Sequence, residues 1–249
     1  KKVLAPNEMP LRKVASQIKS VTPLSRDVKC IKLLLPAGKK IAYLPGQYLE
    51  LILRKNGKSA FSIANAPGSR EIELHIRYTP DGGSCDEIID LLKNETILNI
   101  ELPKGNCILK EENNNTLIFL AGSTGFAPFK AMLEQAFIDG RKQQMYLYWG
   151  GRIVEDIYLH DLAMKWEQKH PNFHYVPVVS EPETQANWHG RTGMVHTAVL
   201  EDFKDLSAGI EVYAGGSPGM VYAALDAFKE KGLPEAQMYS DVFTYAPRP

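Results

Sequence analysis

Cysteine is scarce in this chain of 249 residues, and its three cysteines, Cys30, Cys85 and Cys107, stand far apart. They form no CxxC pair, no disulfide framework and no set of four closely spaced ligands for a plant-type iron–sulfur cluster. No apolar run reaches the roughly 20 residues that span a membrane, and the opening stretch 1–6 is too short for a signal sequence. These absences predict a cytoplasmic protein that binds no metal and does not act at a membrane.

A surplus of charge of one sign is also missing. Lys and Arg together number 29, and so do Asp and Glu, which leaves a formal net charge of zero. A protein that binds nucleic acid needs extra cations to neutralise phosphates, so we expect no nucleic acid among the partners. The chain is long enough for two domains of about 100–150 residues each.

The first part of the chain consists of short apolar runs separated by turn residues. We expect strands at 30–35, 48–53, 72–78 and 97–102, and one short helix that starts near Ser84. Several short strands with a single helix are typical of a small antiparallel β-barrel.

The pattern changes after the polar stretch 111–115, where we place the boundary between domains 1–112 and 113–249. Beyond it, nearly continuous apolar runs alternate with helical patterns, which indicates a parallel sheet with helices on both faces. The expected strands lie at 117–121, 145–149, 175–179, 211–214 and 238–243.

Two glycine-rich turns each follow an expected strand and open a helix. The first is Gly122-Ser123-Thr124-Gly125, and the second is Gly215-Gly216 with Pro218 and Met220 after it. Glycines let the backbone approach a ligand closely, and a helix N-terminus offers free N–H groups to a pyrophosphate. Ligands of open parallel sheets bind at the carboxyl ends of the strands, so the two turns predict one shared dinucleotide site. Either turn alone could be only a tight connection.

These motifs resemble a known family. The segments 45–48 (Pro-Gly-Gln-Tyr) and 61–65 (Phe-Ser-Ile-Ala-Asn) resemble the flavin-binding signatures of ferredoxin–NADP reductase-type enzymes, and the two glycine turns resemble that family's nicotinamide-binding signatures. The segments 148–152, 170–183, 190–193 and 240–243 are most similar to bacterial NAD(P)H:flavin reductases. The resemblance covers essentially the whole chain. It implies an N-terminal flavin-binding β-barrel and a C-terminal Rossmann-like domain for NADH or NADPH.

The resemblance also implies two sets of site residues. The flavin (FAD, FMN or riboflavin) would meet Tyr48, Lys58, Phe61, Ser62, Ile63, Arg77, Gly83, Ser84 and Phe243. The nicotinamide nucleotide would meet Gly122, Ser123, Thr124, Gly125, Arg152, Ser180, Glu181, Gly215, Gly216, Pro218 and Met220.

Ser62 is the expected catalytic residue. In the family the matching hydroxyl lies by the reactive nitrogen of the flavin, where a hydrogen bond can stabilise the charge that arrives with the hydride. The alternative is a strand hydroxyl bound to backbone. For Phe61 and Phe243 the alternative is core packing, and for Ser84 it is a helix cap.

The chain departs from the family both where relatives bind the flavin phosphate and where they bind the 2′-phosphate of NADPH. Ser59 stands where the family has an arginine that pairs with the flavin phosphate, and Asp86 stands where it has Ser or Thr. Lys58 could replace the arginine only as a point charge. We therefore expect the flavin to be an exchangeable substrate. Glu181 stands where plant-type relatives bind the 2′-phosphate of NADPH, so we expect NADH to serve at least as well.

Three functions follow. The first is NAD(P)H-dependent reduction of free flavin, with flavin and nicotinamide as the small-molecule partners. The alternative is a reductase with bound FAD that passes electrons to an iron–sulfur or oxygenase partner, including the reductases of deoxysugar synthesis. Such reductases often carry a ferredoxin domain, which this sequence lacks, so the partner is expected to be a separate chain. The third is a regulator that binds a nucleotide without catalysis.

Overall fold

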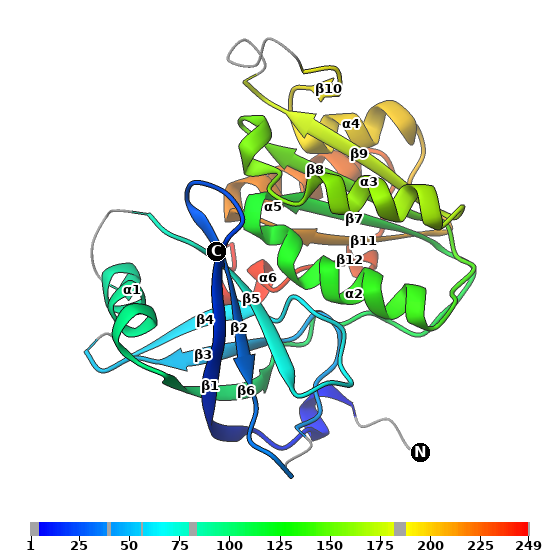
Figure 1. Ribbon diagram of the computed structural model, residues 1–249. Helices are drawn as coiled ribbons and strands as arrows, with labels where there is room; N and C mark the ends of the chain where they lie inside the picture. The colour runs from blue at the N-terminus through cyan, green and yellow to red at the C-terminus, as the bar shows by residue number, and fades with distance from the viewer. Residues whose placement is uncertain (1–4, 39–40, 56, 80–83, 182–187, 249) are drawn as a thin grey trace. The chain divides into compact units, whose positions relative to one another are not determined.

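The computed structural model describes residues 5–38, 41–55, 57–79, 84–181 and 188–248. The chain forms two compact units (Figure 1). Unit 1 comprises Lys1–Leu109 and Lys130–Ala136, and unit 2 comprises Lys110–Phe129 and Phe137–Pro249. An antiparallel barrel followed by a parallel-sheet domain is confirmed as the fold class. The domain boundary after residue 112 remains a prediction. In the structure, the first segment of unit 1 ends at Leu109 and unit 2 begins at Lys110.

Unit 1 is built on one antiparallel sheet with the strand order β4-β3-β6-β1-β2-β5. A single bridge between Ile63 and Leu74 links the two outer strands β4 and β5, so the sheet curls into a barrel that is barely closed there. Its elements are β1 (Arg12–Pro23), β2 (Val28–Leu34), β3 (Tyr48–Ile52), β4 (Lys58–Ser62), β5 (Glu71–Arg77), α1 (Ser84–Asn94) and β6 (Ile97–Lys104), after a short 3-10 helix at Pro6–Glu8.

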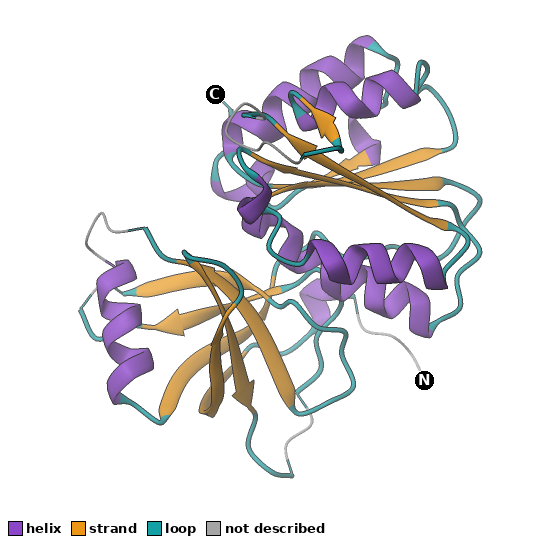
Figure 2. Ribbon diagram, turned by 45° about the horizontal axis from the view of Figure 1, so that its top comes forward, coloured by secondary structure: helices purple, strands orange, loops and turns teal. Residues whose placement is uncertain are grey.

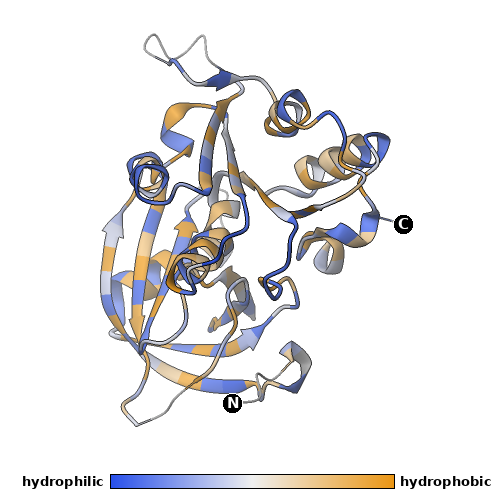
Figure 3. Ribbon diagram, turned by 90° about the vertical axis from the view of Figure 1, so that its right-hand side faces the viewer, coloured by the Kyte–Doolittle hydropathy of each residue, from blue (hydrophilic) through white to orange (hydrophobic). Residues whose placement is uncertain are grey.

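The barrel core follows the two-residue period of the strands. Ile31, Leu33, Leu49 and Leu74 are fully buried inside, and Ile88 of α1 packs into the same core. Figure 3 shows the hydrophobic residues as bands along the strands. The sequence did not predict β1 and β4 as strands, because most side chains of both are polar or exposed.

Unit 2 is built on one parallel sheet with the strand order β10-β9-β8-β7-β11-β12. Its strands are β7 (Thr116–Gly122), β8 (Met145–Gly151), β9 (Phe173–Val179), β10 (Arg191–Thr192), β11 (Ile210–Gly215) and β12 (Met238–Tyr239). Its helices are α2 (Ala127–Ile138), α3 (His160–Lys169), α4 (Val195–Asp202), α5 (Pro218–Glu230) and α6 (Val242–Tyr245), with 3-10 turns at Ser123–Phe126, Val154–Asp156 and Glu235–Gln237. The middle of α2, Lys130–Ala136, belongs to unit 1.

Helices cover both faces of this parallel sheet (Figure 2). Ile118 and Leu120 of β7 pack in one cluster with residues of α4 and α5. On the other face Phe119 meets Phe129 at 5.6 Å between ring centroids. Because both faces are covered, β7 is buried along almost its whole length, as its apolar sequence predicts.

The last expected strand, 238–243, is too long. β12 ends at Tyr239, and Phe243 lies in the short helix α6. The change of direction is fixed at Ser240, whose buried hydroxyl accepts the backbone N–H of Val242 at 3.2 Å. A serine side chain that bonds its own backbone two residues on favours a turn over a strand.

Candidate functional site

The two glycine turns of unit 2 lie against each other. β7 and β11 are neighbours, with Gly215 paired to Ala121, so both strands end at the same edge of the sheet. A Cβ atom on Gly125 would lie 2.2 Å from the carbonyl oxygen of Gly215, and a Cβ on Gly215 would lie 2.6 Å from that of Gly125. No other residue type fits this contact without moving backbone.

Met220 fills the space that two further glycines leave. A Cβ on Gly122 would lie 2.6 Å from the Met220 sulfur, and a Cβ on Gly216 would lie 2.6 Å from the Met220 methyl carbon. Met220 stands in the first turn of α5, after Pro218, and its N–H donates to the Ser217 hydroxyl at 3.3 Å. Met220 thus packs against glycines of both turns.

Ser123 is strained and holds an unsatisfied hydroxyl. It is the one non-glycine residue with a positive φ, +50°, in the described part of the chain. Its carbonyl oxygen accepts the Trp149 indole N–H at 3.0 Å, but its buried Oγ has no hydrogen-bond partner among the described residues. A buried unsatisfied hydroxyl in a glycine cradle fits a site that a polar ligand completes. The residues of this turn are therefore compatible with a nicotinamide nucleotide, and the contact of Thr124 with it remains a prediction.

The ends of β8 and β9 bring the remaining nucleotide candidates together. Ser180 donates its N–H to Gly151, and Glu181 donates its N–H to the Arg152 carbonyl oxygen, at 2.9 and 2.8 Å. The Arg152 side chain is 69% exposed, and its Nε lies 3.7 Å from a carboxylate oxygen of Asp156. This guanidinium is therefore accessible to an anionic ligand at the same edge as Glu181. Arg191, by contrast, is held by Asp202 at 2.6 Å.

In unit 1, Ser62 and Tyr48 face each other across β3 and β4. Directly opposed residues of an antiparallel pair share one face of the sheet, so both hydroxyls lie on the same side. Phe61 points the other way, opposite Leu49, and packs against the barrel core. Ile63 is also fully buried in that core. Contacts of Phe61 and Ile63 with a flavin remain predictions.

Lys58 lies in an ionic network that the sequence did not reveal. Its ammonium is 2.7 Å from Glu101 and 3.2 Å from Glu50, and Lys104 binds the same two carboxylates at 2.8 and 2.7 Å. Hydrogen bonds from Lys104 and Lys58 hold the pKa of Glu101 at about 2, well below its usual value. Since two carboxylates already neutralise two lysines, Lys58 has little charge left for a phosphate.

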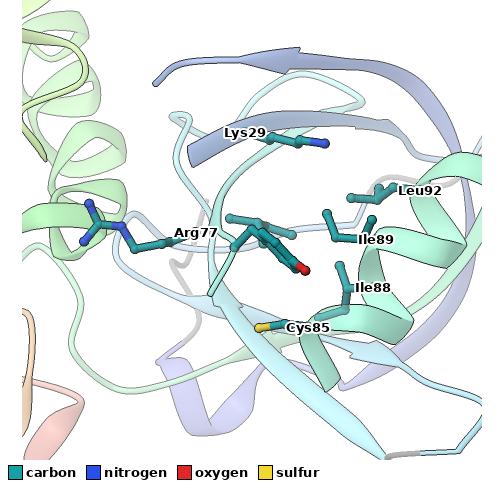
Figure 4. A pocket seen from close by; sticks show the side chains of 8 residues that line it. Lys29, Arg77, Cys85, Ile88, Ile89 and Leu92 are labelled. Atoms are coloured by element: carbon teal, nitrogen blue, oxygen red, sulfur yellow. The ribbon is translucent and has the colours of Figure 1, made fainter. Parts of the chain in front are cut away.

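The remaining residues predicted to contact the flavin lie farther from Ser62 in the sequence. Arg77, at the end of β5, pairs with Asp27 at 3.0 Å. It lines a small, largely apolar pocket beside α1, which begins at Ser84, and its guanidinium points away from that pocket (Figure 4). Phe243 belongs to unit 2, where its ring lies 5.6 Å from that of Tyr222. Gly83 lies outside the described residues.

A buried polar cluster in unit 1 escaped the sequence analysis. His75 hydrogen-bonds Glu73 at 2.8 Å, and the Lys130 ammonium lies 3.2 Å from the same Glu73 oxygen. Burial opposes the charge on Glu73, but the contacts with His75 and Lys130 outweigh it and hold its pKa at about 2. Burial also lowers the pKa of His75 and raises the pKa of the Cys30 thiol to about 11.

Three of these residues could in principle ligate a metal. The donor atoms of Cys30, Glu73 and His75 lie within 4.8 Å of one another. The Lys130 ammonium already neutralises the Glu73 carboxylate, however, and its side chain is only 8% exposed. We therefore assign no metal to this cluster. The sequence signal for it was a lysine among the apolar residues Phe129, Met132 and Leu133 of α2.

Comparisons with known proteins agree with this two-part organisation. Residues 15–108 match the oxidoreductase FAD-binding domain, and residues 119–226 match the oxidoreductase NAD-binding domain. The chain is 43% identical over 228 residues to the CDP-6-deoxy-L-threo-D-glycero-4-hexulose-3-dehydrase reductase of Yersinia pestis, covering 91% of this chain and 68% of that protein. It is 32% identical to an NAD(P)H-flavin reductase of Aliivibrio fischeri, covering 92% and 98%.

A solved structure shows the same fold. The Amycolatopsis cytochrome P450 reductase GcoB superposes with a TM-score of 0.84 at 27% identity, over 93% of this chain and 69% of that one. Among the described residues, no helix combines the length and apolar character required to cross a membrane.

Proposed function

Because this chain belongs to the FAD- and NAD-binding oxidoreductases of the ferredoxin reductase type, we propose that it takes a hydride from NADH or NADPH onto a flavin and delivers the electrons to a separate redox protein. Its relatives support such a partner, since one is named as the reductase of a dehydrase and another as a cytochrome P450 reductase. Reduction of free flavin, which the sequence alone favoured, becomes the second candidate.

The packing of Gly125 on Gly215 is the observation that carries the proposal. It leaves no side chain between the two turns, so the backbone of both turns can approach a pyrophosphate closely. Ser123 would give its unsatisfied Oγ to the same ligand. A nicotinamide nucleotide held by fixed backbone groups is oriented at little entropic cost, which is what hydride transfer requires.

Ser62 and Tyr48 would form the polar side of the flavin site. When bound, the flavin supplies the hydride acceptor, and the protein supplies position and electrostatics. The Ser62 hydroxyl would donate a hydrogen bond to the atom that gains charge. Tyr48, on the same face, would fix the orientation of the ring.

Weak retention of the flavin is part of this proposal. A bidentate arginine contact to phosphate is missing at Ser59, and Glu101 and Glu50 occupy Lys58. A hydrogen bond to a charged group is worth roughly 1.5–3 kcal/mol, so its loss weakens flavin binding by about tenfold to a hundredfold. We expect the flavin to exchange, and riboflavin and FAD to bind with similar affinity.

NADH is the proposed electron donor. Glu181 can accept hydrogen bonds from ribose hydroxyls but would repel a 2′-phosphate. The exposed Arg152 beside it is the group that could still bind NADPH. A cytoplasmic location, expected from the cysteine pattern, also remains part of the proposal.

Gel filtration followed by acceptor assays tests the function. The chain is loaded with FAD, passed over a column, and supplied with NADH and either a [2Fe–2S] protein, cytochrome c or free flavin. Electron delivery to the protein acceptors in proportion to bound FAD, whether retained on the column or added back, supports the proposal. Turnover that needs added flavin and bypasses the protein acceptors favours free flavin reduction instead. No oxidation of NADH or of NADPH under any condition contradicts both.

A further inference from the structure

The segment that follows Ser62 is fixed by hydrogen bonds to other parts of unit 1. Ala64 donates its N–H to Glu73 at 2.8 Å, and the Asn65 side chain bonds the backbone of Glu71 and Glu73, both at 2.8 Å. The buried Tyr43 hydroxyl bonds the carbonyl oxygens of Asn65 and Ala66 at 3.1 and 3.0 Å. The end of β4 is thereby tied down directly after the candidate catalytic serine.

Lys130 and Glu134 complete this attachment. The Lys130 ammonium donates to the Ala64 carbonyl oxygen at 3.2 Å and to a Glu134 oxygen at 2.7 Å. The other Glu134 oxygen accepts the Ala66 N–H at 3.1 Å. Together with Glu73 at 3.2 Å, Lys130 has three polar contacts and a side chain only 8% exposed.

Burying a lysine in a helix face carries a large desolvation free energy. Removing an ammonium from water costs several kcal/mol unless it is well paired, and an apolar side chain of similar size often serves stability as well. Lys130 provides what an apolar residue cannot, which is a fixed bond to the backbone two residues beyond Ser62. The two carboxylates that pair with it also bind or border the same segment.

We infer that Lys130 is a positioning residue for Ser62. It holds Ala64 so that the Ser62 hydroxyl keeps the place from which it assists hydride transfer. This inference rests on the proposed function. A displacement of the order of 1 Å in a catalytic group can cost up to about a hundredfold in rate, so a looser segment slows the reaction without weakening substrate binding.

The test is a double-mutant cycle in the full chain loaded with FAD. Lys130→Met should lower the single-turnover rate of flavin reduction by NADH about tenfold and leave the KM for NADH within about twofold. Combined with Ser62→Ala, it should cause no further loss, because both changes remove the same interaction. An unchanged rate, or a loss in the double variant equal to the product of the single losses, overturns the inference.

Two milder variants cover the case in which Lys130→Met does not fold. Glu134→Gln and Tyr43→Phe loosen the same segment and should show the same loss of rate without further loss in the Ser62→Ala background. Tyr175→Phe is the matched control, since it removes another buried hydroxyl, bound to His160 at 2.9 Å in unit 2. It should leave the rate unchanged. Independent losses for both loosening variants contradict the role of the segment.

Amide hydrogen exchange in the flavin-free chain separates this inference from the proposed function. The Ala64 and Ala66 amides should exchange at least about tenfold faster in Lys130→Met, while the central strands of the barrel keep their protection. Unchanged exchange at Ala64 and Ala66 overturns the inference even if the parent reduces flavin. A parent that fails to reduce flavin overturns the function alone.

Discussion

Unit 2 forms its candidate site from backbone, whereas unit 1 forms its own from side chains. In unit 2, Gly125 and Gly215 are in contact because neither has a Cβ. In unit 1, the candidate contacts depend on Ser62, Tyr48 and Lys58, and two carboxylates already hold the lysine. A backbone site fails when a side chain is added where two backbones touch, while a side-chain site can be retuned by a single substitution, such as serine for arginine at position 59.

The largest effect is expected where the backbone site is filled. Gly125→Ala places a methyl group 2.2 Å from the Gly215 carbonyl oxygen, so backbone must move. At about 3 kcal/mol of overpacking, kcat/KM for NADH should fall about a hundredfold. Flavin binding, measured by fluorescence, should not change, since it depends on unit 1.

Gly219→Ala is the matched control for this change. It lies in the same motif, but a Cβ there would meet no atom within 4 Å in the described part of the chain beyond its own helix turn. We expect kcat/KM within about twofold of the parent, because an alanine in a helix costs no packing. Equal effects of the two alanines would show that the contact between the turns is not what matters.

A pH effect of comparable size is expected from Glu73 in unit 1. Its pKa is held at about 2, below the usual 4.5, so its charge stabilises the fold fully above about pH 4.5 and progressively less as the pH falls toward 2. The free energy of unfolding should therefore exceed that of Glu73→Gln by about 2–3 kcal/mol near pH 6, with the difference shrinking below pH 4.5.

Urea unfolding at a series of pH values measures this difference, with the exposed Glu230→Gln as control. The same difference at all pH values would show that Glu73 is not ionised against Lys130 and His75. That result would also remove the charge pair on which the cluster depends.

Ser62→Ala should lower the rate of flavin reduction about tenfold or more, the range for removing a well-placed hydrogen-bond donor. The Tm should stay close to that of the parent, because Ser62 lies at the end of its strand. Ser16→Ala serves as the control, since the Ser16 hydroxyl is buried without a partner among the described residues. A rate within about twofold of the parent would remove the catalytic role of Ser62.

Restoring the family's arginine tests the reason for which we expect the flavin to exchange. Ser59→Arg, alone or with Asp86→Ser, should raise the affinity for FAD about tenfold through a charge-assisted contact to phosphate. Affinity for riboflavin, which has no phosphate, should not change. If FAD leaves the variant on a column as readily as it leaves the parent, the missing phosphate contact is not the cause of exchange.

The smallest effect is expected at the ribose site of unit 2. Glu181→Arg should shift the ratio of kcat/KM toward NADPH by about tenfold, which needs only roughly 1.4 kcal/mol. The parent should use NADH at least as well as NADPH. A parent that prefers NADPH by more than about tenfold would place the phosphate on Arg152 instead.

The sequence predicted the candidate site of unit 2 better than that of unit 1, for physical reasons. Glycine turns after buried strands are local patterns, and parallel strands bring their ends to one edge, so the meeting of Gly125 with Gly215 could be anticipated. The partners of Lys58 could not, because Glu50 and Glu101 reach it only through the pairing of β3 with β4 and β6. Lys130 beside Glu73 likewise depends on which helix covers β5, and no local period encodes that.

Anaerobic mixing of the FAD-loaded chain with NADH tests the central claim most directly. The claim is that a hydride passes from the nucleotide held by the glycine turns to a flavin beside Ser62. We predict that the visible absorption of the flavin bleaches in a single fast phase. This phase should be slower in Ser62→Ala, and in Gly125→Ala it should need a higher concentration of NADH. A flavin that stays oxidised with both NADH and NADPH would contradict the account.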